Sequence, residues 1–199
     1  MRLPSLLQFR ILKEAFKALF TGPYTTKFPY KPHTPAEKFR GKPEFDEEEC
    51  VGCGACVEVC PPQCIDMVDG EEKRKFTLRY DDCIFCGQCQ ANCITEKGIR
   101  LTLEYDLATF DRTKARTSIE KDLLFCEHCG EVVGAIDHVK WVVRRLGLLA
   151  YTNLGLLLVS HKELGLAEKE VRRLKEFPKR SDRIKFLCPK CRREVTLAD

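Results

Sequence analysis

The sequence contains no apolar run that could cross a membrane as a single helix. Its longest apolar stretch, Leu146 to Val159, includes Thr152 and Asn153, whereas a spanning helix needs about 20 apolar residues. We therefore expect no transmembrane helix, and we interpret this stretch as a buried strand or the end of a helix. No segment has the pattern of a secretory signal. The cysteines are explained by the metal sites described below, and this use of cysteine favours a reducing, cytoplasmic setting.

An excess of charge of one sign is also missing. The 34 lysines and arginines stand against 30 aspartates and glutamates, so the formal net charge is +4. This composition does not indicate a nucleic-acid-binding protein, and we expect no nucleic acid among the partners. Asparagine and glutamine are scarce while charged residues reach 32%, a balance that favours a thermophilic source.

The motifs of several enzyme classes are absent as well. The sequence has no glycine-rich nucleotide-binding loop, no Cys-x-x-x-Cys-x-x-Cys radical motif and no nucleophile–base constellation. We therefore expect that the chain is not an enzyme on its own.

Cysteine is abundant, and eight of the 13 cysteines form one pattern written twice. The first run is Cys50-x-x-Cys53-x-x-Cys56-x-x-x-Cys60-Pro61, and the second is Cys83-x-x-Cys86-x-x-Cys89-x-x-x-Cys93. Each cysteine of the second run lies 33 positions after its counterpart, as Cys83 does after Cys50. This is the spacing of a bacterial-type ferredoxin that holds two [4Fe-4S] clusters, and such clusters transfer single electrons.

The last cysteine of each run binds the other cluster in two-cluster ferredoxins. This rule assigns Cys50, Cys53, Cys56 and Cys93 to cluster 1, and Cys83, Cys86, Cys89 and Cys60 to cluster 2. A zinc site would use two cysteine pairs instead of two runs of four, and a disulfide framework suits short secreted chains. Gly52, Gly54 and Gly87 suit loops whose backbone closely approaches an inorganic core.

The second run departs from the usual pattern, because Cys93 is followed by Ile94 and not by proline. The segment from Ile94 to Gly98 is also one residue longer than its counterpart in the first run, counted to the next apolar position at Ile99. Proline is not a ligand, so we expect the cluster to form with a changed local turn and potential. Cys64 has no obvious partner, and we interpret it as a small buried residue near a cluster.

A further metal site is indicated by two Cys-x-x-Cys knuckles, Cys126 to Cys129 and Cys188 to Cys191. Four thiolates in this arrangement form a tetrahedral site, which is usually structural zinc. The same knuckles resemble rubredoxin, which holds one redox-active iron, although Arg192 stands where rubredoxin has glycine. Zinc is our first prediction and mononuclear iron the alternative. We expect His128 to lie outside the ligand shell, and the 58 residues between the knuckles (130–187) to form an inserted subdomain.

The predicted organisation is an α+β chain with four parts. Residues 1–22 contain an amphipathic anchoring helix over 3–20, with Leu3, Leu6 and Leu7 on its apolar face, that lies on a membrane or docks on a partner. An extended proline-rich linker (23–43) leads to the two-[4Fe-4S] ferredoxin-like domain (44–106). The last part (107–199) is a zinc-ribbon-like or rubredoxin-like four-cysteine subdomain with a helical insertion.

Secondary structure is predicted most clearly inside the ferredoxin-like domain. Each half should give a strand, a cluster loop, a short helix and a return strand, with strands over 76–80 and 99–105. Asp69-Gly70 marks a hairpin between the halves. We predict a connecting segment over 107–125 and helices over 131–146 and 161–177.

These features together resemble the two-[4Fe-4S] subunit that respiratory complex I shares with the membrane-bound group 4 [NiFe]-hydrogenases. The resemblance covers nearly the whole chain and is strongest to the electron-transfer subunit of formate hydrogenlyase. It depends on Phe39-Arg-Gly-Lys-Pro-Glu44 before the first cysteine run, on Cys83-Ile-Phe-Cys-Gly87, and on the C-terminal knuckles. The missing proline after Cys93 departs from that family's pattern.

The resemblance implies a non-catalytic subunit that relays electrons to or from the catalytic subunits of a membrane-bound hydrogenase-type complex. It implies a peripheral position on the cytoplasmic face of the membrane, contact through the N-terminal helix, and partner subunits that include an electron donor or acceptor. A complex I-like enzyme that reduces quinone or sulfur compounds is the alternative, followed by a free ferredoxin. The catalytic partner, the donor, the potentials and the pumped ion are not encoded in this chain.

Overall fold

A computed structural model describes residues 9–22, 25–166 and 185–197 of the chain. The chain divides into two compact units, Met1–Phe39 and Arg40–Asp199. The predicted boundary between the ferredoxin-like domain and the four-cysteine subdomain, after residue 106, therefore lies inside the second unit.

The described part of the first unit consists of helix α1 (Phe9–Thr21) and a chain over 25–39 that forms no helix or strand. Every described residue of α1 is exposed. Phe9, Leu12, Phe16 and Leu19 recur at intervals of three or four residues, so they line one face of the helix. The helix predicted over 3–20 is present from Phe9, whereas Leu3, Leu6 and Leu7 lie outside the described residues.

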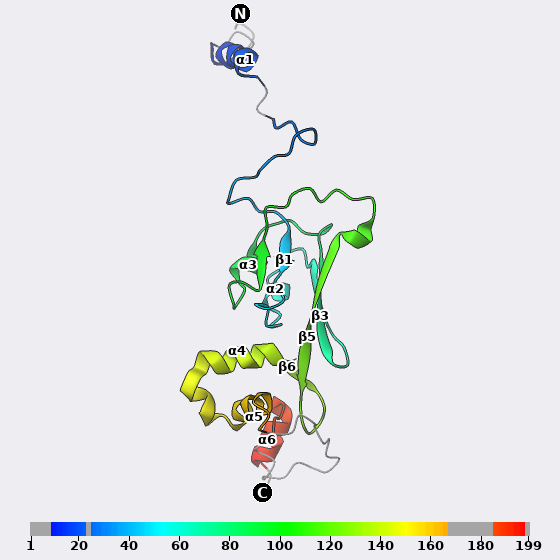
Figure 1. Cartoon of the computed structure of the whole chain (residues 1–199), viewed down its shortest axis with the longest axis vertical. Helices are drawn as coiled ribbons and strands as arrows, with labels where there is room; N and C mark the ends of the chain where they lie inside the picture. Colours follow the sequence, from blue (N-terminus) through cyan, green and yellow to red (C-terminus); the bar gives the residue numbers. More distant parts are fainter. Residues whose placement is uncertain (1–8, 23–24, 167–184, 198–199) are drawn as a thin grey trace, which may run out of the picture. The chain divides into compact units, whose positions relative to one another are not determined.

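The second unit begins with two similar halves, which confirms the predicted strand–loop–helix–strand order (Figure 1). The first half contains β1 (Pro43–Phe45), α2 (Ala55–Glu58) and β2 (Ile65–Asp69). The second half contains β3 (Lys73–Arg79), α3 (Gln88–Ala91) and β4 (Ile99–Leu101). β1 pairs antiparallel with β4, and β2 pairs antiparallel with β3 across the predicted turn at Gly70. β4 is shorter than the strand predicted over 99–105, because only its first three residues form a regular ladder.

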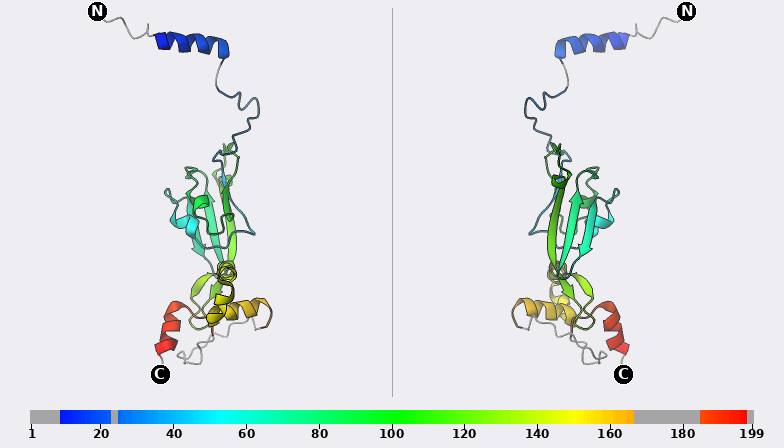
Figure 2. Two further views of the ribbon diagram at one scale, coloured as in Figure 1. Left: turned by 90° about the vertical axis from the view of Figure 1, so that its left-hand side faces the viewer. Right: turned by 90° about the vertical axis from the view of Figure 1, so that its right-hand side faces the viewer.

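A long strand follows where the sequence predicted only a connection. After the 3-10 helix η2 (Arg112–Lys114), β5 (Arg116–Phe125) pairs with β3 along seven residues, and then with β6 (Val132–Ala135). The sheet therefore has the order β2-β3-β5-β6, and Figure 2 shows its long strands running side by side in both views. The prediction of a connecting segment over 107–125 missed this strand, because cross-strand pairing with β3 overrides the mixed charge of the segment.

The insertion between the knuckles is helical, with one correction to its start. Helix α4 covers Ile136–Leu146, whereas the residues before it, predicted as part of the same helix, form β6. The 3-10 helix η3 (Gly147–Thr152) and helix α5 (Leu154–Glu163) follow. The apolar run from Leu146 is thus not a buried strand, and Leu148 within it is 85% exposed. Of the helix predicted over 161–177, residues 161–163 form the end of α5, but residues 164–166 form a turn, so the helix does not continue there. Residues 167–177 lie outside the described chain.

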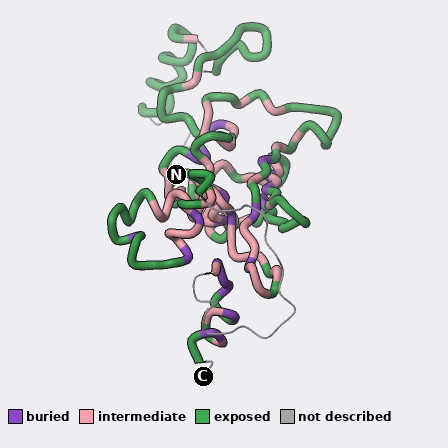
Figure 3. Tube along the Cα trace, turned by 60° about the horizontal axis from the view of Figure 1, so that its bottom comes forward, coloured by how far each residue is buried: buried purple, intermediate pink, exposed green. Residues whose placement is uncertain are grey.

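The last element is helix α6 (Pro189–Leu197), which buries Cys191 and Val195. Figure 3 shows buried stretches of the chain, drawn in purple, close to the C terminus. Within the described ranges, no helix is both long enough and apolar enough to span a membrane.

Candidate functional site

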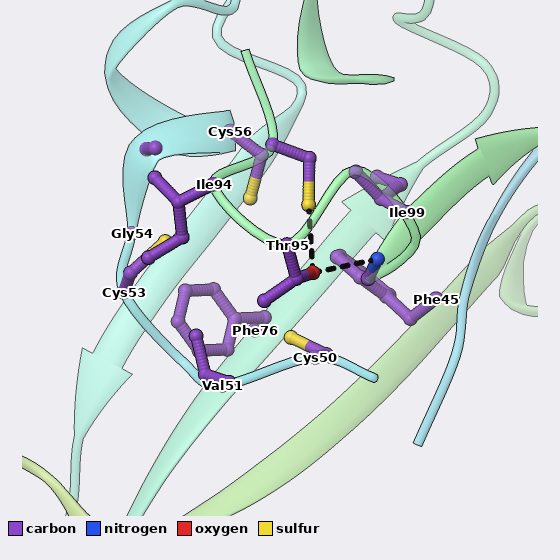
Figure 4. Close-up of a pocket in the computed structure, with 13 residues that line it drawn as sticks. Phe45, Cys50, Val51, Cys53, Gly54, Cys56, Phe76, Ile94, Thr95 and Ile99 are labelled. Carbon is purple, nitrogen blue, oxygen red and sulfur yellow. Dashed lines mark hydrogen bonds between the residues drawn. The ribbon is translucent and has the colours of Figure 1, made fainter. Parts of the chain in front are cut away.

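Four cysteines from the two halves meet around one hollow in the ferredoxin-like core. Cys50, Cys53 and Cys56 come from the first loop and α2, and Cys93 comes from the end of the second half. Figure 4 shows Cys50, Cys53 and Cys56 around a common space beside Phe76 and Ile99. Together with Cys93, these are the four residues predicted to bind cluster 1.

A second hollow gathers the other predicted set. Cys83, Cys86 and Cys89 from the second loop and α3 line it together with Cys60 from the first half. Each hollow thus combines three cysteines of one half with the distal cysteine of the other, as crossed ligation requires. Both are walled by apolar core residues, chiefly Ile65, Leu78 and Ile99.

The backbone repeats with the same 33-residue period as the cysteines. Helices α2 and α3 begin 33 positions apart, each after a left-handed glycine, Gly54 with φ 84° and Gly87 with φ 80°. Two further pairs of left-handed positions obey the offset, Gly52 with Phe85 and Gln63 with Glu96. A left-handed backbone conformation costs a non-glycine residue about 1–2 kcal/mol. Gln63, Phe85 and Glu96 adopt this conformation, so the surrounding fold imposes it on the loops.

Each hollow contains a thiol that is difficult to ionise without a bound cation, Cys56 in the first and Cys89 in the second. Burial, aided by the neighbouring thiolates, raises the pKa of Cys56 to about 12 and that of Cys89 to about 11, where the Gln90 N–H opposes the shift. A metal centre supplies the positive charge that such crowded thiolates need. The donor set, its convergence and its burial therefore fit a thiolate-ligated iron–sulfur cluster in each hollow.

Strand β5 brings Lys121 against the first cluster loop, a placement that sequence reasoning missed. The Lys121 Nζ donates to the Glu47 carbonyl at 2.5 Å and lies 3.4 Å from the Asp137 carboxylate. A Cβ on Gly52 would lie 2.9 Å from the Ala135 Cβ and 3.1 Å from the Lys121 Cβ, so β5 and β6 press against the cluster loop. Burial raises the pKa of Cys50, while the Gly52 N–H and the Lys121 charge oppose that shift. The available signal was Ile119 and Leu123, two apolar residues four apart, since even spacing puts both on the inner face of a strand.

The two distal cysteines have different neighbours. The Cys93 Sγ lies 3.4 Å from the Thr95 Oγ1, whereas the Cys60 Sγ lies 3.4 Å from the Cys64 Sγ. Cys64 is only 1% exposed, and burial raises the pKa of its thiol, aided by hydrogen bonding to Cys60. Its placement in the core agrees with the prediction of a small buried residue beside a cluster.

The four cysteines of the knuckles also converge. The sulfurs of Cys126, Cys129, Cys188 and Cys191 all lie within 4.8 Å of one another. The Cys129 and Cys188 sulfurs are 3.7 Å apart, close to the edge of about 3.8 Å of a tetrahedron with metal–sulfur bonds of about 2.3 Å. Burial opposes ionisation of Cys126, but backbone N–H groups of Cys188, Cys129 and His128 outweigh it and lower its pKa to about 7. The geometry fits one four-coordinate metal ion.

Each knuckle is carried by a different kind of element. Cys126 and Cys129 lie in the turn between β5 and β6, while Cys188 leads into α6 with Pro189 at its first position. The first knuckle is thus a turn between two strands and the second opens a helix, and the zinc-ribbon-like fold stays a prediction. Arg192, the residue that departs from rubredoxin, donates from Nη1 to the Asn153 Oδ1 at 3.5 Å and so ties α6 to the start of α5. Among the described residues, the buried His128 Nδ1 has no hydrogen-bond partner.

The ferredoxin-like part defines a class of protein. The sequence profile of the 4Fe-4S dicluster domain matches residues 35–97, which include both cysteine runs. The chain is therefore an iron–sulfur protein of the dicluster type, with a mixed helix and sheet architecture.

Curated relatives narrow the class to one family. The chain is 36% identical over 111 residues to NADH-quinone oxidoreductase subunit I 2 of Geobacter metallireducens, a match that covers 51% of this chain and 84% of that protein. It is 36% identical over 98 residues to NAD(P)H-quinone oxidoreductase subunit I of Gloeobacter violaceus, covering 45% of this chain and 46% of the relative. The chain belongs to the quinone oxidoreductase subunit I family. Apart from the Geobacter protein, the chain spans about half the length of these relatives.

A solved structure that is similar in sequence comes from a membrane complex. It is titled a membrane-bound sulfane sulfur reductase, an archaeal respiratory membrane complex, and one of its chains is 30% identical. The match covers 58% of this chain and 61% of that chain with a TM-score of 0.41, which does not establish a shared overall fold. The relatives are named as subunits of oxidoreductases, which agrees with the prediction that this chain is not an enzyme on its own.

Proposed function

We propose that this protein relays single electrons through two [4Fe-4S] clusters as a subunit of a membrane-bound respiratory oxidoreductase complex. One observation carries the proposal: each of two hollows gathers three cysteines of one half and the distal cysteine of the other. The clusters supply one-electron chemistry, and the chain supplies eight thiolates, a buried apolar wall and a fixed separation. The ligands are Cys50, Cys53, Cys56 and Cys93 in one hollow and Cys83, Cys86, Cys89 and Cys60 in the other.

The catalytic partner has two candidates. The group 4 hydrogenase-type complex is supported by the segment before the first cysteine run and by the C-terminal knuckles. A complex I-like complex is supported by the names of the relatives, all of which are quinone oxidoreductase subunits. A free ferredoxin is less well supported, because helix α1 leaves its apolar residues exposed within the described part of the first unit.

Helix α1 is our candidate for peripheral membrane contact. Phe16, Leu19 and Phe20 are 64% to 84% exposed, and Arg10, Lys13 and Lys17 provide cations on the same helix. Such a helix lies in a membrane interface with its apolar face buried and its cations near anionic headgroups. We place the protein on the cytoplasmic face, as the reducing chemistry of its cysteines favours. Docking of the same face on a partner subunit is the alternative.

The four-cysteine site of the knuckles is proposed to hold structural zinc, with mononuclear iron as the alternative. The support is the convergence of four sulfurs within 4.8 Å on a core of only five buried residues. A core this small gains much of its stability from a bound metal, and four protein ligands leave no open position for a substrate.

An anaerobic affinity pull-down from gently solubilised membranes tests the proposal. We expect a multi-subunit assembly whose iron–sulfur absorbance bleaches when its electron donor is added. Nickel in the assembly and bleaching by H2 would identify the hydrogenase type, while a nickel-free assembly that is inert to H2 would identify the quinone- or sulfur-reducing type. Recovery of the chain alone from the soluble fraction would contradict the proposal. A variant without residues 1–22 should leave the membrane with both clusters intact.

A further inference from the structure

The two halves differ most at the turn after the distal cysteine. With the 33-residue offset, Ile94 and Thr95 stand where Pro61 and Pro62 stand in the first half. The second turn is also one residue longer, since β2 begins at Ile65 and β4 begins 34 positions later, at Ile99. This is the departure from which the sequence predicts a changed local turn and a changed cluster potential.

The longer turn places a hydroxyl group on a ligand sulfur. The Gly98 N–H donates to the Thr95 Oγ1 at 3.0 Å, and the same oxygen lies 3.4 Å from the Cys93 Sγ (dashed lines in Figure 4). A cysteine sulfur bound to iron carries no proton, so it can only accept a hydrogen bond. The Thr95 oxygen already accepts from Gly98, which leaves its own proton directed to the sulfur.

The geometry leaves little freedom for this hydroxyl to move. A Cβ on Gly98 would meet the Thr95 Oγ1 and the Cys50 Cα at 3.0 Å and the Cys93 Sγ at 3.2 Å. The turn is therefore packed tightly against two predicted ligands of the same hollow. The threonine is also β-branched, which restricts its side chain to few rotamers.

We propose that Thr95 is a positioning residue that raises the reduction potential of the cluster bound by Cys50, Cys53, Cys56 and Cys93, through a hydrogen bond to the Cys93 sulfur. The inference rests on the proposed two-cluster function. A reduced cluster carries one more negative charge than an oxidised one, so a donor on a ligand sulfur stabilises the reduced state more.

The other cluster lacks this donor. Pro62 has neither a hydroxyl nor a backbone N–H, and the side-chain contact of the Cys60 sulfur is the Cys64 thiol at 3.4 Å. A thiol is a weaker hydrogen-bond donor than a hydroxyl group. Thr95 therefore adds a difference between the potentials of the two sites, and it favours the electron on the cluster beside Thr95.

An EPR-monitored redox titration of the purified, cluster-loaded full-length protein tests the inference. Thr95→Val keeps the shape of the side chain and removes the hydroxyl group, and Thr95→Ser restores the hydroxyl group. At a fixed potential, we expect Thr95→Val to lower the reduced-to-oxidised ratio of one cluster about tenfold, which is about 59 mV for a one-electron couple. Thr95→Ser should stay near the wild-type value.

A matched control separates this effect from a general loss of threonine. Thr102 is part-buried and donates to the Lys42 carbonyl at 2.9 Å, away from any cysteine, so Thr102→Val should leave both potentials unchanged. Unchanged potentials in Thr95→Val, or equal shifts of both clusters, would overturn the inference. Iron content and spin quantitation test the underlying function separately, because a wild-type protein without two [4Fe-4S] clusters would refute the two-cluster proposal itself.

Discussion

At the scale of single residues, the distal cysteines carry the most information, because each belongs to one half and faces the hollow of the other. Cys93 lines the hollow of Cys50, Cys53 and Cys56, and Cys60 lines the hollow of the second loop. Their substitution therefore separates crossed from local ligation in one experiment.

We predict that Cys93→Ser alters the cluster bound by the first loop and that Cys60→Ser alters the cluster bound by the second. Loss of one thiolate ligand should convert or destroy that cluster, while its neighbour keeps its signal. EPR spectra and iron content of the two purified variants measure this. Damage to the cluster of the same half in both variants would show that the ligation is local.

Gly54 gives a second prediction at this scale. Its φ is +84°, and an added Cβ would lie 3.1 Å from the Met67 Sδ. We expect Gly54→Ala to lose about 1–2 kcal/mol of stability through backbone strain, seen as earlier thermal loss of the iron–sulfur absorbance. Gly134→Ala is the control, because a Cβ there meets nothing within 4 Å and φ is not in the left-handed region. Equal melting of both variants would contradict the strain argument.

The cysteines that are predicted cluster ligands were easier to predict from the sequence than the residues around them. The cysteine spacing predicted both ligand sets, because consecutive loops of fixed length must place thiolates around one small core. Thr95 and Lys121 were not predicted, since their roles depend on a one-residue insertion and on strand pairing. Neither has a spacing rule that can be applied to a sequence alone.

At the scale of secondary-structure elements, β5 shows where propensity fails. Its residues alternate in burial, with Ile119 and Leu123 buried, but charged residues between them suggested a connection. The strand forms because β3 offers an unpaired edge of matching length, which is a tertiary effect. The β2–β3 hairpin, by contrast, was predicted correctly from its Asp69-Gly70 turn, a local signal.

Arg74 forms an ion pair within the β2–β3 hairpin and a hydrogen bond to the first cluster loop. The Arg74 guanidinium donates two hydrogen bonds to the Asp69 carboxylate, at 2.6 and 2.9 Å, and one to the Gly52 carbonyl at 3.2 Å. The hydrogen bonds from Arg74 hold the pKa of Asp69 below its usual range, against a smaller opposing effect of burial.

This pair gives a prediction for pH dependence. A carboxylate with a lowered pKa stabilises the fold at all pH values above its ordinary pKa of about 3.9 and loses that effect as the pH falls through the lowered value. Asp69→Asn should therefore lower the melting temperature by about 2–4 °C, for a contribution of about 1 kcal/mol. The difference should stay constant from pH 5 to pH 8, in thermal melts of the loaded protein. A difference that shrinks between pH 8 and pH 5 would contradict the lowered pKa.

At the scale of the whole molecule, the second unit connects two kinds of predicted metal site through one continuous sheet. β3 belongs to the ferredoxin-like halves, β5 pairs with it, and β5 ends at Phe125, directly before Cys126. The sequence predicted both kinds of site but separated them by a boundary after residue 106. It could not show the shared sheet, because the β3–β5 ladder joins segments far apart in the sequence, as in the pairing of Lys73 with Asp122.

Removal of the metal from the knuckles should therefore affect one end of this unit. We expect the double variant Cys126→Ser and Cys191→Ser to lose one metal ion and to become protease-sensitive between the knuckles, because the small core there depends on the metal. Cluster spectra should stay close to wild type. Elemental analysis and limited proteolysis measure these effects, and the loss of a separate redox signal would identify iron in place of zinc. Unchanged metal content would exclude the four-cysteine site.

The seven-residue ladder between β3 and β5 also limits where the chain can tolerate insertions and deletions. Lys121 and Ile119 face the same side of the sheet, so an insertion or deletion of one codon between them would turn one of them to the opposite face. Length variation is better tolerated over 102–111, which precedes the ladder and contains no strand. In an alignment of orthologues, gaps should therefore collect in that loop and be absent from β5, even though the charged residues of β5 are free to vary.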